Sequence, residues 1–154
     1  MKHPTQKSRR WAAMSATVLA IDAILLLKST RSPQITQVTA NPEIRIGVKD
    51  LRPGEVRFFV YEDRAGQRIR FLLARDSTAQ TKAAFDACQR CYLYHKGYVS
   101  SRGDLICKYC GNHYKLEKMQ SGLASCIPVK LPIQTTEQTA TIKSAELERQ
   151  RGPF

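Results

Sequence analysis

The chain has 154 residues and a formal net charge of +12, because 25 Lys and Arg residues outweigh 13 Asp and Glu residues. Residues 1–34 account for +5 of this charge and the remainder of the chain for +7. The remainder, about 120 residues, is long enough for one small globular domain. Its basic residues are scattered, and it contains no Ser/His/Asp set, paired-carboxylate motif or phosphate-binding Gly loop. The sequence therefore gives no support for a hydrolase or a kinase.

The N-terminus joins a basic flank to an apolar stretch. Residues 1–10 carry four Lys or Arg residues, and residues 11–27 are apolar except for Asp22. These 17 residues are at the lower limit of a helix that crosses a bilayer. Only Lys28 and Arg31 follow closely, so the positive-inside rule places the N-terminus in the cytoplasm and the rest of the chain outside. We therefore predict a cytoplasmic basic flank at 1–10 and a transmembrane signal anchor at 11–27.

The anchor is expected to be retained, because no small-x-small cleavage site directly follows Leu27; a cleaved signal peptide is the alternative. Residues 28–42 are rich in Ser, Thr, Gln and Pro and are predicted to form a linker. Residues 43–150 are predicted to form a small, mainly β domain. The expected protein is thus a single-pass component of the cytoplasmic (inner) membrane whose C-terminal domain faces the periplasm or the cell exterior.

Apolar and polar residues alternate through much of this domain with the period of two that is typical of half-buried strands. Between residues 68 and 75 the alternation places Ile69, Phe71 and Leu73 on one face. After the last strand, Ser144 is expected to cap a short final helical turn. The same alternation, or a run of aromatic and β-branched residues, predicts the other strands at 44–48, 56–61, 81–87, 96–99, 112–116 and around Ile142.

The cysteines form the strongest pattern of the chain. The first four form two C-x2-C pairs separated by fifteen residues, and another fifteen residues separate Cys110 from Cys126. Two such pairs at this separation can close four thiolates around one metal ion or a small iron–sulfur cluster. Thiolate sulfur is a soft ligand, so it favours zinc, iron or copper(I) over magnesium or calcium. The candidate ligands are Cys88, Cys91, Cys107, Cys110 and Cys126.

The fifth cysteine and the neighbouring side chains leave several arrangements open. Cys126 is expected near the site as a fifth, alternative or outer ligand, with a free surface thiol as the alternative. His95 and His113 are nearby imidazoles and Met119 is a soft ligand for copper, although four cysteines already fill a tetrahedral shell. Gly111 suits a tight turn whose N–H groups point at thiolate sulfur. Structural disulfides are another alternative, but they would leave one cysteine over.

A set of short motifs supports a more specific interpretation. They are residues 51–59 (LRPGEVRFF), 70–71 (RF), 84–92 (AFDACQRCY), 96–98 (KGY), Cys107-x-x-Cys110-Gly111 and Cys126-x-Pro128. With these motifs the chain resembles the FtrD-like membrane iron–sulfur protein family over residues 44–147. The resemblance matches all five cysteines to the family's cysteines. It implies a membrane-associated, extracytoplasmic cysteine site that handles electrons for iron-transport systems.

The chain departs from the family pattern in two places. Ser125 and Ile127 flank Cys126, where the family usually has Gly and Asn. Many relatives also carry several membrane spans, whereas this sequence offers one. A single span cannot form a transport pore, so any transport role requires a separate permease.

Together these observations predict a membrane-anchored extracytoplasmic iron–sulfur or other thiolate-metal protein that transfers electrons in association with iron transport. The expected cofactor is an iron–sulfur cluster or iron, with zinc or copper as alternatives. The expected partners are the membrane and a separate permease or redox protein; the predicted topology argues against nucleic acid. Such a protein is an electron carrier or metal-binding protein rather than an enzyme. The alternatives are a structural zinc-ribbon-like interaction domain and a copper-handling or thiol redox protein.

Overall fold

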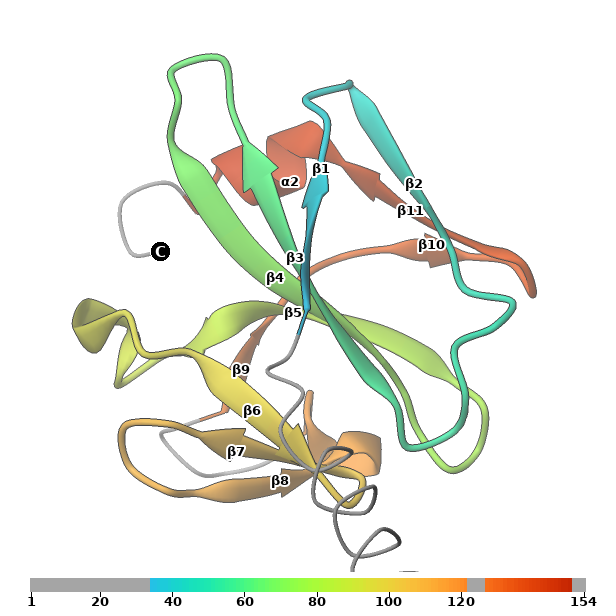
Figure 1. Cartoon of the computed structure of the whole chain (residues 1–154), viewed down its shortest axis with the longest axis vertical. Coiled ribbons are helices and arrows are strands. Elements are labelled where there is room, and N and C mark those ends of the chain that lie inside the picture. The colour runs from blue at the N-terminus through green and yellow to red at the C-terminus, as the bar shows by residue number, and fades with distance from the viewer. Residues whose placement is uncertain (1–33, 122–126, 151–154) are drawn as a thin grey trace, which may run out of the picture. The chain divides into compact units, whose positions relative to one another are not determined.

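The computed structural model describes residues 34–121 and 127–150 (Figure 1). The predicted anchor at 11–27 and Cys126 lie outside these residues. Within the described ranges, no helix is both long and apolar enough to span a membrane. The described part is mainly β, which confirms the predicted class of the domain.

A five-stranded sheet with the order β1-β3-β4-β5-β9 is the centre of the fold (Figure 1). Two hairpins join its three long, antiparallel strands β3 (Val56–Glu62), β4 (Arg68–Arg75) and β5 (Thr81–Cys88). At one edge β1 (Ile35–Val38) runs parallel to β3, and at the other β9 (Pro128–Lys130) runs antiparallel to β5. Cys88 is the last residue of β5, so this sheet delivers the first cysteine directly.

Two small sheets accompany the central one. The first, in the order β10-β11-β2, contains β10 (Gln134–Thr135), β11 (Thr139–Lys143) and β2 (Glu43–Gly47). The second, in the order β6-β7-β8, contains β6 (Tyr98–Ser101), β7 (Asp104–Cys107) and β8 (His113–Lys115). Three short helices complete the described part: the 3-10 helices η1 (Tyr92–Tyr94) and η2 (Leu116–Lys118), and the α-helix α2 (Ser144–Glu148).

Side chains of the central strands alternate between two separate cores. Phe59, Phe71 and Phe85 are opposite one another in the register and point to one side, where the rings of Phe59 and Phe71 stack with centroids 5.2 Å apart. We call this side the apolar core; it also contains Ile69 and Leu73, as predicted, together with buried residues of β2, β11 and α2. The other side, the cysteine core, contains Phe58, Leu72, Ala74, Ala84, Cys88, Cys91, Tyr98, Leu105, Cys107, Leu116 and Met119.

Lys82 connects the hairpin between β4 and β5 to η2, next to the cysteine core, through an ion pair and hydrogen bonds. Oδ1 of Asp76 accepts N–H bonds from Thr78 (3.0 Å) and Gln80 (2.9 Å), which shapes the turn. Oδ2 of Asp76 lies 2.7 Å from Nζ of Lys82. The same ammonium donates to the backbone carbonyls of Leu116 and Glu117 in η2, at 3.3 and 2.8 Å. Because Lys82 is mostly buried, this contact fixes η2 on the central sheet.

Two predictions on local structure are wrong. Ile35–Val38 form strand β1, although the sequence places them in the linker at 28–42. Three of the four residues of β1 are exposed, so the strand lacks the buried stripe that makes a strand visible in a sequence. Ser144 does not cap the final helix: it is the first helical residue, and the N-cap position belongs to Lys143, which makes no side-chain cap bond.

Candidate metal centre

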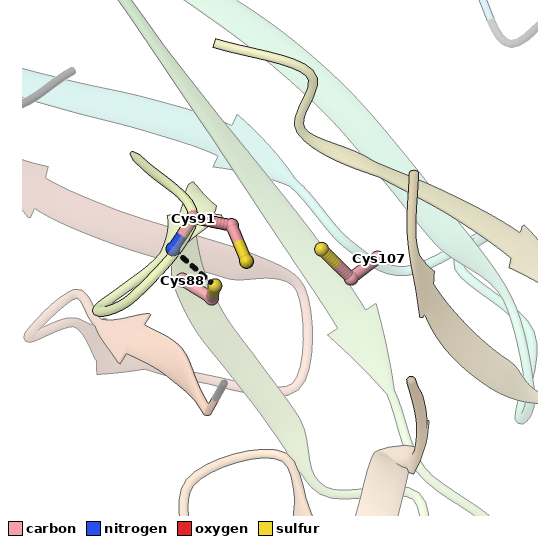
Figure 2. Close-up of side chains that lie close together, drawn as sticks. All are labelled: Cys88, Cys91 and Cys107. Carbon is pink, nitrogen blue, oxygen red and sulfur yellow. Dashed lines mark hydrogen bonds between the residues drawn. The ribbon is translucent and has the colours of Figure 1, made fainter. Parts of the chain in front are cut away.

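Three of the five cysteines meet in the cysteine core. Cys88 ends β5, Cys91 directly precedes η1, and Cys107 ends β7. Their sulfur atoms all lie within 4.8 Å of one another, and all three residues are buried. Figure 2 shows Cys88 and Cys91 side by side, with the sulfur of Cys107 facing them from a separate segment of the chain. The fold therefore brings one thiol of the second C-x2-C pair against both thiols of the first.

The register of the hairpin β6–β7 determines where Cys107 lies. Cys107 is paired with Tyr98 across this hairpin. The N–H of Tyr98 in turn donates to Oδ1 of Asp86 at 2.7 Å, and Asp86 is in β5, two residues before Cys88. One hydrogen bond thus connects the two cysteine-bearing segments, and the strand pairing aligns Cys107 with the end of β5.

Both cysteine pairs aim backbone N–H groups at sulfur. The N–H of Cys91 donates to Sγ of Cys88 at 3.0 Å (Figure 2). In the second pair, the N–H groups of Cys110 and Tyr109 donate to the sulfur of Cys107. Gly111 closes this turn with φ +71° and donates to the carbonyl of Cys107 at 2.9 Å, so the turn predicted there is confirmed. Such donors stabilise the thiolate form and orient it toward a cation.

Cys110 lies at the rim of the site. It is exposed and does not belong to the buried group of three, but its thiol hydrogen-bonds with that of Cys107. The four cysteines that the structure describes are all free, so it contains no disulfide between them. Cys126 lies outside the described residues, and its predicted place near the site stays a prediction.

Burial is the dominant electrostatic effect at this site. It raises the pKa of Cys107, against the N–H groups of Cys110 and Tyr109, which lower it. Burial likewise raises the pKa of the phenol of Tyr98, and the neighbouring Cys88 and Cys107 raise it further. Low-dielectric surroundings disfavour isolated thiolates, whereas a bound cation deprotonates coordinating thiols. The site is therefore suited to a cation and unsuited to free thiolates.

A buried carboxylate that the sequence patterns did not reveal lies beside the cysteines. The side chain of Asp86 is 1% exposed, and its Oδ2 lies 2.6 Å from Nη2 of Arg70. Burial raises the pKa of Asp86 to about 6, although Arg70 and the N–H of Tyr98 act to lower it. Gly97 packs against this carboxylate: a Cβ there would lie 2.5 Å from Oδ2. An acidic residue on the same strand face as Ala84 and Cys88 was the signal that could have revealed it.

The spacing of the three thiols fits a single tetrahedral ion. Metal–sulfur bonds of about 2.3 Å place two thiolates of such an ion roughly 3.8 Å apart. The three sulfur atoms lie within 4.8 Å of one another, which is compatible with this value, and the cavity that the three cysteines line has a volume of about 10 Å³. That volume is near the size of one water molecule. Thiolates that bind different irons of a cluster lie further apart, because the iron–iron separation is added.

The other predicted ligand candidates are placed differently. His95 lines the same small cavity as Cys88, Cys91 and Cys107. The ring of His113 is exposed, and its Nδ1 lies 3.6 Å from Oδ2 of Asp104. Met119 is fully buried in the cysteine core. The structure thus offers Cys110 at the rim and His95 at the cavity wall for a fourth position.

Two exposed tyrosines flank the site. Tyr94, in η1, and Tyr109, between Cys107 and Cys110, stack with ring centroids 3.7 Å apart and an interplanar angle of 9°. Leu93 beside them is 68% exposed. Exposed apolar side chains at the rim of a polar site are typical of surfaces that other molecules cover.

A buried set of thiols in a small β domain, with N–H groups aimed at sulfur, defines a thiolate metal-binding domain. The family model of the membrane iron-sulfur containing protein FtrD-like matches residues 51–154. This match covers more than half of the chain, and the chain belongs to that family. The resemblance stated from the sequence motifs is therefore confirmed.

Solved structures give distant similarities. The quaternary ammonium Rieske monooxygenase CntA, in complex with inhibitor MMV12, has 14% identity and a TM-score of 0.44, covering 75% of this chain and 36% of CntA. Naphthalene 1,2-dioxygenase with bound indole has 15% identity and a TM-score of 0.41, covering 68% of this chain and 26% of the dioxygenase. The chain thus spans only about a third of CntA and about a quarter of the dioxygenase. No curated protein matches the chain.

Proposed function

We propose that this protein is a membrane-anchored, extracytoplasmic electron-transfer component associated with iron transport. In this proposal Cys88, Cys91, Cys107 and Cys110 hold an iron centre through their thiolates. The observation that carries it is the buried group of three thiols within 4.8 Å, to which Cys110 is hydrogen-bonded. Membership in a family of membrane iron–sulfur proteins supports iron as the metal.

Several features of the chain suit electron transfer. Iron between four thiolates changes its oxidation state by one electron and needs no added group to do so. The N–H bonds to the sulfurs of Cys88 and Cys107 hold these ligands in place and favour the reduced, more negative form. Burial of three ligands excludes water, whereas exposed Cys110 gives a partner protein an approach to one edge of the centre.

Of the forms that an iron centre takes, a single iron ion is the one that we propose. The close spacing of the thiols and the small volume between them support it over a cluster of several irons. The same spacing favours a second candidate, a structural zinc site in a domain that binds other proteins. The two candidates share their ligands and differ in colour and redox activity, since zinc is colourless and has no redox chemistry.

The experiment is a metal and acid-labile sulfide analysis of the purified full chain, combined with an anaerobic optical spectrum. One iron per chain without labile sulfide, and an absorption that bleaches reversibly on reduction, is the expected result. Two or more irons with matching sulfide would establish a cluster and exclude the single ion. One zinc in a colourless protein would replace electron transfer with the structural zinc role.

Topology and the fifth cysteine are also part of the proposal. Residues 11–27 are proposed to anchor the chain in the cytoplasmic membrane with the domain outside. A reporter fused after Phe154 should be active only in its extracytoplasmic form. Cys126 is proposed to lie beside the centre as a fifth, alternative or outer ligand. Alkylation of Cys126 should then be slow in the metal-bound protein and fast after metal removal; equal rates would show that it is a free thiol.

A further inference from the structure

A second cavity adjoins the metal centre. Its volume is about 120 Å³, and its lining residues are Arg68, Arg70, Asp86, Ala87, Tyr92 and His95. Three of these residues also line the small cavity among the cysteines, namely Ala87, Tyr92 and His95. The two cavities are therefore neighbours that share one wall, formed by the end of β5 and the segment that follows Cys91.

Strand alternation explains the chemistry of this cavity. In β4, Arg68 and Arg70 point to the same side of the sheet as Leu72 and Ala74, which belong to the cysteine core. Along this strand, one face of the sheet thus changes from apolar to cationic. The two arginines lie at the start of β4, where the cysteine core ends and the cavity opens.

The cationic groups exceed the anionic ones within the cavity. Among the described residues that line the cavity, Asp86 is the only one with a carboxylate, and Arg70 already contacts it at 2.6 Å. Within the described part of the chain, Arg68 forms no ion pair. Glu62 is opposite Arg68 in the strand register, but it is exposed and does not line the cavity. A guanidinium has five N–H donors, so Arg70 retains donors beyond those that Asp86 uses.

We propose that this cavity binds a small oxyanion, a carboxylate or a phosphate, between the guanidinium groups of Arg68 and Arg70. Planar guanidinium groups bind such anions through two parallel hydrogen bonds, which gives both affinity and orientation. The imidazole of His95 lines the cavity as a further donor. This proposal does not depend on the metal or on electron transfer, because none of the four cysteines that the structure describes lines the cavity.

The test is calorimetric titration of the full chain, purified in detergent with its metal, using citrate and inorganic phosphate at constant ionic strength. At least one of the two should bind saturably to one site. Arg68→Gln should weaken that binding about tenfold, because it removes charge-assisted hydrogen bonds. Glu62→Gln, which removes an exposed carboxylate outside the cavity, should not weaken it. Arg102→Gln, an exposed arginine in the turn between β6 and β7, should leave it unchanged.

Two outcomes would overturn the proposal. One is the absence of saturable binding of either anion to the unmodified chain. The other is an equal loss of affinity in Arg68→Gln and Arg102→Gln, which would show that only net charge matters. NMR titration of the unmodified chain keeps the test valid if Arg68→Gln does not fold. Resonances of Tyr92 and His95 should shift with the added anion, and shifts confined to other residues would place the anion elsewhere.

Discussion

The two sides of the central sheet use the same strands but are stabilised in different ways. The apolar core is made of aromatic and aliphatic side chains, with the stacked pair Phe59 and Phe71 at its centre. The cysteine core contains three thiols and Tyr98, and the buried carboxylate of Asp86 lies at its margin. Burial of apolar surface is the main stabilisation of the first side. The second side also contains groups that favour burial only when they are paired.

The two small sheets also differ in what stabilises them. The sheet β10-β11-β2 contributes Ile44 and Ile142 to the apolar core, so its strands are held by packing. The sheet β6-β7-β8 has strands of three or four residues, and sheets of this size are marginal without a further link. Besides the packing of Tyr98 and Leu105 in the cysteine core, its links are the cysteines, the Asp86–Tyr98 bond and the contact of Lys82 with η2. We therefore expect metal binding to stabilise one side of the molecule far more than the other.

The largest effect is expected from removing a buried thiol. Cys88→Ser, Cys91→Ser and Cys107→Ser should each lower metal affinity by more than about tenfold, since an open coordination position remains. Hydrogen exchange should then accelerate in β6, β7 and β8, while β2 and β11 keep their protection. Metal analysis and exchange measured by mass spectrometry on the same samples test both parts.

Two variants provide the matched comparison for this prediction. Ser101→Ala, at the exposed end of β6, should change neither metal content nor exchange. Cys110→Ser should have a smaller effect than the buried cysteines, because Cys110 lies at the rim. Faster exchange in β2 and β11 after loss of Cys107 would contradict the separation of the two sides.

A substitution in the apolar core should lower the stability of the fold without affecting metal binding. Phe71→Ala removes a fully buried ring from the apolar core and should destabilise the fold by about 3–5 kcal/mol. The metal content of the folded fraction should remain unchanged, because Phe71 points away from the cysteines. Urea unfolding gives the first quantity and metal analysis the second, with Phe71→Leu as the milder control. Loss of metal from folded Phe71→Ala protein would show that the two cores are coupled.

A substitution of Gly97 tests how closely the carboxylate of Asp86 is packed. Gly97→Ala should destabilise the protein by about 2–3 kcal/mol, because the new Cβ would lie 2.5 Å from Asp86 and φ is +69°. Gly103→Ala is the matched control, since φ there is +77° and a Cβ added at this residue would meet no atom within 4 Å. It should cost only about 1 kcal/mol. Equal losses in the two variants would mean that backbone strain, and not Asp86, explains the role of Gly97.

The sequence predicted the parts of the fold that have a periodic or spaced signal. Ile69, Phe71 and Leu73 alternate within one strand, and the structure places all three in the apolar core. The two C-x2-C pairs predicted that thiols converge, and three of them do.

The features that the sequence did not predict depend on contacts between distant segments. Strand β1 is held by pairing with β3 and buries little, so its residues carry no amphipathic pattern. The contact between Asp86 and Tyr98 depends on how the hairpin β6–β7 lies on β5. The cavity of Arg68 and Arg70 likewise exists only because the segment after Cys91 passes beside β4. Local preferences do not specify such arrangements.

The smallest expected effect concerns the link between the β4–β5 hairpin and the cysteine side. Burial acts to raise the pKa of Asp76, but the bonds from Lys82, Thr78 and Gln80 outweigh it and hold that pKa below 3.8. The unfolded chain therefore takes up this proton at a higher pH than the folded one. The stabilisation is present above the ordinary pKa of an aspartate and is lost as the pH falls through the lower, folded value. Asp76→Asn keeps an oxygen for the turn but removes the charge, so it should cost about 1 kcal/mol at neutral pH.

Urea unfolding between pH 3 and 7 tests whether the stabilisation by Asp76 decreases as the pH falls. The difference between the unmodified chain and Asp76→Asn should shrink as the pH falls. A double-mutant cycle that combines Asp76→Asn with Lys82→Met isolates the interaction energy of the Asp76–Lys82 pair. The cycle is needed because Lys82 also donates to the carbonyls of η2. Lys82→Met should accelerate exchange in η2 more than Asp76→Asn does, since only the lysine contacts both segments. A pH-independent difference, or equal exchange in the two variants, would show that the turn alone, and not this link to the cysteine side, accounts for the role of Asp76.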